Sequence, residues 1–129
     1  MKIFSSIFLA LVLVILALMI VSGGDNIVNS VADGNNVSVI EGKQIINITA
    51  KGGYSPLRSI AKAGIPTILR VVTDGTFDCS SYVRVPSLNI GQSLASSGTT
   101  DIDLGSPKEG ILYGTCGMGM YPFEIDFQA

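Results

Sequence analysis

The sequence predicts an all-β sandwich or small barrel that follows an apolar N-terminal segment. About seven short runs rich in β-branched residues recur at intervals of roughly ten residues, and Gly and Pro separate them. Helical periodicity is hard to find from Val37 onward. Hydrophobic residues make up 47% of the 129-residue chain and charged residues 14%, a composition that excludes a disordered protein.

Residues 1–21 are expected to form a membrane anchor. The run from Ile3 to Val21 is interrupted only by Ser5 and Ser6. As a helix rising about 1.5 Å per residue, it would span close to the ~30 Å hydrocarbon core of a bilayer. Lys2 precedes the run and no charged residue follows until Asp25, which favours an N-terminus inside and a domain outside the cytoplasm. A cleaved signal peptide is the alternative, and it too places the domain on the extracytoplasmic side.

A linker is expected over residues 22–36, where Gly, Asn and Asp are frequent, and a single domain over residues 37–129. The expected strands of this domain are 44–50, 59–62, 67–73, 82–85, 100–104, 110–115 and 123–127. The run at 67–73 is almost continuously apolar, whereas 100–104 and 123–127 alternate polar with apolar residues. Each alternating strand should therefore have one face in contact with solvent.

Two features of the composition narrow the range of functions. The chain has no His, so it cannot build a Ser-His-Asp triad, a Cys-His pair, a His-ligated zinc centre or an imidazole-ligated copper site. The net charge is −2 and no basic patch is visible, so nucleic acid is not an expected partner. We therefore expect a binding protein rather than an enzyme.

Sulfur is concentrated in one short segment near the C-terminus. Cys116-Gly117-Met118-Gly119-Met120 contains one of the two cysteines and both methionines that lie beyond the apolar run. The segment falls between two expected strands, where a sandwich displays its binding residues. Its glycines remove bulk beside each sulfur and let the backbone bend around something small. The second cysteine, Cys79, lies in the loop after the strand expected at 67–73.

At these residues the chain resembles the cupredoxin family, over roughly 46–127. The resemblance is carried by Tyr54-Ser55-Pro56, by Ala63-Gly64-Ile65-Pro66 before a strand, by Cys79, and by the loop 115–121 before the last strand. It looks most like the small cupredoxin-like domains of exported or membrane-tethered bacterial and archaeal proteins. It implies a cupredoxin-like antiparallel Greek-key β-sandwich whose first metal ligand follows a central strand. The remaining ligands would come from the loop before the last strand.

Carried over residue by residue, the resemblance implies Cys79, Cys116, Met118 and Met120 as metal ligands. Both histidines of a blue-copper centre are missing. Thiolate and thioether are soft donors that select Cu(I), so we expect copper, as Cu(I), to be bound by an all-sulfur site. The expected role is sequestration of the ion or its transfer to or from a donor or acceptor protein.

Two alternatives of other classes stay open at this point. Cys79 and Cys116 could form a disulfide, as is common in exported domains, and the domain would then be a disulfide-stabilised surface module that binds another protein. The chain could also be a cupredoxin-type electron carrier, although such sites use two imidazoles that this sequence lacks.

Overall fold

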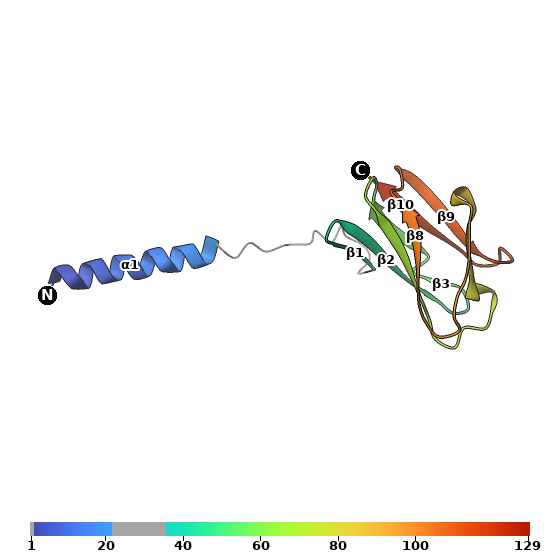
Figure 1. The fold of residues 1–129 in the computed structure, drawn as a ribbon, viewed down its shortest axis with the longest axis horizontal. Helices are drawn as coiled ribbons and strands as arrows, with labels where there is room; N and C mark the ends of the chain where they lie inside the picture. The colour runs from blue at the N-terminus through green and yellow to red at the C-terminus, as the bar shows by residue number, and fades with distance from the viewer. Residues whose placement is uncertain (1, 22–35) are drawn as a thin grey trace.

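The structure is a computed structural model that describes residues 2–21 and 36–129 (Figure 1). Helix α1 spans Lys2–Val21, and its side chains from Ile3 to Ala17 are exposed. Within these described ranges, no helix combines the length and the apolar character that crossing a membrane requires. The membrane anchor predicted for residues 1–21 thus gains no support here. The predicted linker lies outside the described residues except for Asn36.

The described part of the domain consists of short strands and two 3-10 turns. In chain order they are β1 (Val37–Ile40), β2 (Lys43–Ala50), β3 (Tyr54–Ser55), β4 (Arg58–Lys62), β5 (Thr67–Thr73), η1 (Cys79–Ser81), β6 (Tyr82–Val85), η2 (Pro86–Leu88), β7 (Ile90–Ser93), β8 (Gly98–Gly105), β9 (Gly110–Cys116) and β10 (Pro122–Gln128). All seven expected strands are confirmed, with ends that differ by no more than two residues. The short strands β1, β3 and β7 were not expected.

The strands form two sheets, which Figure 1 shows as the two layers of a sandwich. One sheet has the order β1-β2-β5-β8 with β3 beside β2, and the other has the order β4-β10-β9-β6-β7. The expectation of a purely antiparallel sandwich is wrong, because β2 pairs in parallel with β5 and β4 pairs in parallel with β10. Between β2 and β5 the chain forms β4, which belongs to the other sheet. This crossover lets β5 enter the first sheet parallel to β2.

The core lies between the two sheets and follows the two-residue period of the strands. Alternate residues of β2, Ile46 and Ile48 among them, are buried from one side, and alternate residues of β10, such as Phe123 and Ile125, are buried from the other. Cys116, the last residue of β9, is fully buried in the same core. One of the predicted metal ligands is therefore part of the packed interior.

Gly114 of β9 leaves a space that the ring of Phe123 fills. A Cβ atom at position 114 would clash with that ring. The ring cannot move away easily, because it is 3% exposed and packs edge-on against Tyr54 with ring centroids 4.8 Å apart. Gly114→Ala is therefore expected to lower the free energy of unfolding by about 1–3 kcal/mol or more, as measured by chemical denaturation.

The matched control for this prediction is Gly117→Ala. A Cβ at position 117 would meet the Tyr82 ring at an ordinary contact distance of 3.6 Å. This variant should unfold at close to the parent's denaturant midpoint. Equal losses of stability in the two variants would contradict the argument from Phe123.

Candidate functional site

The two cysteines lie next to each other at one end of the sandwich. Cys79 begins η1 and Cys116 ends β9, and their Cα atoms are 5.6 Å apart. In this structure they form a disulfide, so neither is the thiolate that the sequence analysis expected of a metal ligand. The disulfide alternative describes the state seen here. Metal binding by the two cysteines stays a prediction for the reduced chain.

The segment that follows Cys116 is a tight turn between β9 and β10. Thr115 pairs with Pro122 across the hairpin, and the Cys116 amide donates to the Tyr121 carbonyl at 3.1 Å. The Gly119 amide donates to the Cys116 carbonyl, also at 3.1 Å. Gly119 has a φ of 78°, a left-handed conformation that glycine adopts without strain. These bonds fix the path of the backbone that carries the two methionines.

Met118 and Met120 are exposed on this turn, with 83% and 64% of their surfaces accessible. The turn itself rests on the disulfide, because the backbone N–H of Met118 donates to Sγ of Cys79 at 3.3 Å. Neither methionine is a core residue, so interior packing does not explain why two large apolar side chains occupy the turn. Their thioethers are free to contact a ligand.

Asp78 anchors the turn that carries Cys79. One carboxylate oxygen accepts hydrogen bonds from the amide of Ser80, at 2.7 Å, and from its hydroxyl. The other accepts from the amide of Gly52 at 2.8 Å, in the loop between β2 and β3. These bonds, the Ser80 hydroxyl first among them, lower the pKa of Asp78 and keep it ionised. Because both oxygens accept hydrogen bonds from the surrounding backbone, Asp78 positions the loop.

Tyr54 supports the site from the interior. Its hydroxyl donates to the carbonyl of Tyr82, the residue that follows η1, at 2.9 Å. Burial, with a smaller contribution from the charge of Asp78, raises the pKa of Tyr54, so its hydroxyl stays protonated and remains a donor. Tyr54 and Asp78 therefore hold the η1 turn at both of its ends. Sequence reasoning missed both roles. The bonds of Tyr54 to Tyr82 and of Asp78 to Gly52 join distant segments, whereas the bond of Asp78 to Ser80 is a local cap that an Asp before a turn could have indicated.

The donor set around the disulfide is unusual for a metal site. Within residues 2–21 and 36–129, no three His, Cys, Asp or Glu side chains gather that could hold a metal ion. A metal at this end would therefore depend on the thioethers of Met118 and Met120 as well as on reduced cysteines. Two thiolates with two thioethers suit Cu(I), whereas zinc sites use Cys, His and carboxylate ligands.

Three solved structures resemble this chain in fold. The metal-binding domain of the Cu(I)-exporting P-type ATPase CopA of Streptococcus pneumoniae D39, determined with Cu(I), is 22% identical with a TM-score of 0.67, and the match covers 72% of this chain and 93% of that one. A copper binding protein in the apo form is 19% identical with a TM-score of 0.68, and the match covers 74% of this chain and 98% of that one. Auracyanin B is 11% identical with a TM-score of 0.51, and the match covers 74% and 96%. The fold is cupredoxin-like.

No protein-family model matches the chain, and no curated protein matches it in sequence. The likeness therefore rests on structure, and at identities of 11–22% it shows the fold alone.

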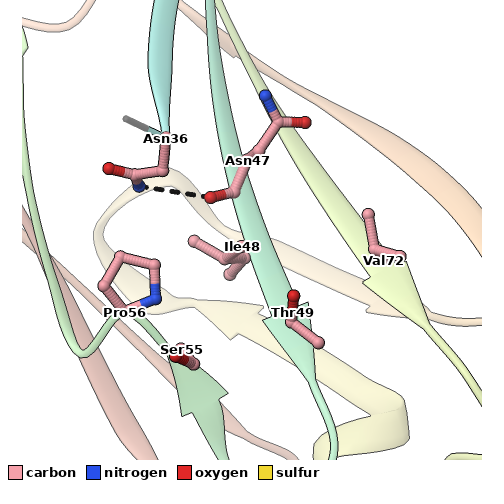
Figure 2. A pocket seen from close by; sticks show the side chains of 7 residues that line it. All are labelled: Asn36, Asn47, Ile48, Thr49, Ser55, Pro56 and Val72. Carbon is pink, nitrogen blue, oxygen red and sulfur yellow. Dashed lines mark hydrogen bonds between the residues drawn. The ribbon is translucent and has the colours of Figure 1, made fainter. Parts of the chain in front are cut away.

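This cupredoxin-like domain also has a shallow pocket of about 430 Å³, lined by Asn36, Asn47, Ile48, Thr49, Ser55, Pro56 and Val72 (Figure 2). The side-chain amide of Asn36 donates to the Asn47 carbonyl at 3.2 Å, as Figure 2 shows. The lining contains no charged residue, no sulfur and no residue of the Cys79 or Cys116 loops. The pocket therefore offers no group for acid–base or metal chemistry, and it shares no lining residue with the site around the two cysteines.

Proposed function

We propose that the reduced domain binds Cu(I) through Cys79, Cys116, Met118 and Met120, outside the cytoplasm, and that it sequesters the ion or transfers it. One observation carries this proposal. The fold brings the two cysteines to a Cα–Cα distance of 5.6 Å, beside a turn that exposes two methionines. Reduction would release two thiolates at a place where two thioethers are already accessible. A binding rather than a catalytic role is part of this proposal.

The chemistry of the donors and the fold both support copper. Thiolates and thioethers prefer Cu(I), and without His the chain cannot supply the imidazoles that a blue-copper centre uses. Two proteins of similar fold are described as a Cu(I)-containing metal-binding domain and as a copper binding protein. The copper ion would be the cargo of this domain, and a donor or acceptor protein would be its second partner.

An extracytoplasmic location is supported by the disulfide, because disulfides form and persist in oxidising compartments. The apolar run of residues 1–21 is the segment that would direct export, and it would tether the domain to the membrane if it is not cleaved. N-terminal sequencing of the protein from membrane and soluble fractions tests whether this segment is retained as a tether or cleaved.

The test of copper binding is an anaerobic titration of residues 1–129 after reduction, with a thiol count before the metal is added. We expect tight binding of Cu(I), and no intense blue colour with Cu(II) because imidazole is absent. A stable, strongly coloured Cu(II) adduct would instead favour the electron carrier.

Replacement of both methionines tests whether Met118 and Met120 are copper ligands. Met118→Leu with Met120→Leu should weaken Cu(I) binding by about tenfold or more, because both thioether donors are lost. The stability of the metal-free domain should change by less than about 1.5 kcal/mol, since Leu replaces Met at similar volume. Binding is measured by competition with a chromophoric Cu(I) chelator. Ile40→Leu, an exposed conservative change on β1, is the control.

The disulfide favours a second candidate, a disulfide-stabilised domain that binds another protein. In that case the purified protein should show no free thiol, and the reduced protein should bind Cu(I) no better than the double Leu variant does. The same titration therefore decides between the two functions.

A further inference from the structure

The two sulfurs of the disulfide differ in their surroundings. Cys116 has no exposed surface, and it lies within the sheet, opposite Val83 of β6. Its own amide is bonded to the Tyr121 carbonyl, which closes the hairpin over it. Cys79 begins a 3-10 turn at the end of the sandwich and is only partly buried. A reagent in solution therefore meets Cys79 first.

The exposed side of this bond also carries a hydrogen-bond donor. The backbone N–H of Met118 points at Sγ of Cys79 at 3.3 Å. Such a donor stabilises negative charge on that sulfur when Cys79 is released as a thiolate. The ionised carboxylate of the neighbouring Asp78, which accepts hydrogen bonds from Ser80 and Gly52, opposes this charge in part. Accessibility therefore selects Cys79 for the first attack, and the Met118 donor assists the later release of Cys79.

We infer that Cys79 is a thiol-exchange site, at which dithiol reductants attack the disulfide in a fixed direction, with Cys116 as the leaving sulfur. A thiolate of the reductant forms a bond to Sγ of Cys79, and the Cys79–Cys116 bond breaks with its electron pair going to Cys116. The second thiol of the reductant, as a thiolate, then attacks its own mixed disulfide and releases Cys79 as a thiolate. The protein gains two electrons, the dithiol becomes a disulfide, and its two protons pass to the cysteines or to water.

This direction of attack has a consequence for the copper site, which rests on the proposed function. The mixed disulfide at Cys79 would block one ligand while freeing the other, so loading would await the second step. Exchange at Cys79 does not itself require copper.

Two single-cysteine variants test the inference. Cys116→Ala leaves only the thiol of Cys79, and Cys79→Ala leaves only that of Cys116; both variants lose the disulfide. In the folded state, Cys79 should react with an aromatic disulfide reagent at least about 100-fold faster than Cys116 does. The reason is that the buried Cys116 reacts only when the domain opens locally. In denaturant the two variants should react at similar rates. Similar rates in the folded state, or a faster Cys116, would overturn the inference.

A second measurement uses the parent chain, in case one variant does not fold. The reduced protein is treated with limiting iodoacetamide under anaerobic native conditions and is then digested with trypsin. Cleavage after Arg70, Arg84 and Lys108 places Cys79 in the peptide 71–84 and Cys116 in the peptide 109–129. Early label should appear in 71–84, and label that appears first in 109–129, or equally in both, would refute the assignment. Neither readout involves copper, so failure here is distinguishable from failure of the proposed function.

Discussion

Oxidation of the reduced domain to its Cys79–Cys116 disulfide is expected to abolish tight Cu(I) binding, with affinity falling by about a thousandfold or more. The bond consumes both thiolates, which supply the charge and the softest donors of the proposed site. The remaining thioethers of Met118 and Met120 are neutral, and their exposure leaves any bound ion open to solvent. Competition with a chromophoric Cu(I) chelator measures the affinity of the oxidised, reduced and re-reduced protein.

The control is the double variant Cys79→Ala with Cys116→Ala. It should bind Cu(I) as weakly as the oxidised parent does and should not respond to oxidant or reductant. If the oxidised parent binds as tightly as the reduced one, the cysteines are not ligands and the copper proposal fails in its present form.

Loss of the disulfide is expected to lower the free energy of unfolding by about 4 kcal/mol, the chain-entropy value for a cross-link that closes a loop of this length. The two cysteines are 37 positions apart, and the loop between them contains β6, β7 and β8. Urea denaturation of the oxidised parent and of Cys79→Ala with Cys116→Ala measures the difference. Alanine is chosen at position 116 because a serine hydroxyl would be buried in the core.

This prediction has its own check within the parent protein. Reduced parent without metal should unfold at nearly the midpoint of the double Ala variant, and added Cu(I) should raise the midpoint of the parent alone. A loss of stability below about 1 kcal/mol would mean that the disulfide adds little beyond the packing of Cys116.

The strands could be predicted from sequence because they bury alternate residues, as in 123–127 and in 67–73, although the second run is almost continuously apolar. The same pattern gives the faces of a strand but not its neighbours, so the parallel pairings β2–β5 and β4–β10 were missed. The edge strands β1 and β7 have few buried residues and gave no periodic signal. The local pattern of polar and apolar residues therefore predicts the strands but not how they pair in the sheets.

The candidate site could be predicted in part. The unusual concentration of sulfur identified Cys116, Met118 and Met120 directly, whereas Cys79 became a candidate ligand through a resemblance. The bond of Asp78 to Gly52 could not be predicted, because it joins loops that meet only in the folded domain. Nor could the sequence decide between a disulfide and two thiols, which depends on the redox conditions as well as on distance.

The position of β10 also determines how the domain can fold. β10 lies between β4 and β9, and its pairs with β4 join residues from the two ends of the domain, such as Glu124 with Arg58. Contacts that are so distant in sequence form late, because a long loop must close before they gain any stabilisation. During synthesis, Cys79 emerges well before Cys116 and before the strand that completes the sheet. The native disulfide cannot form until Cys116 has been synthesised, and until then Cys79 is open to pairing with other thiols.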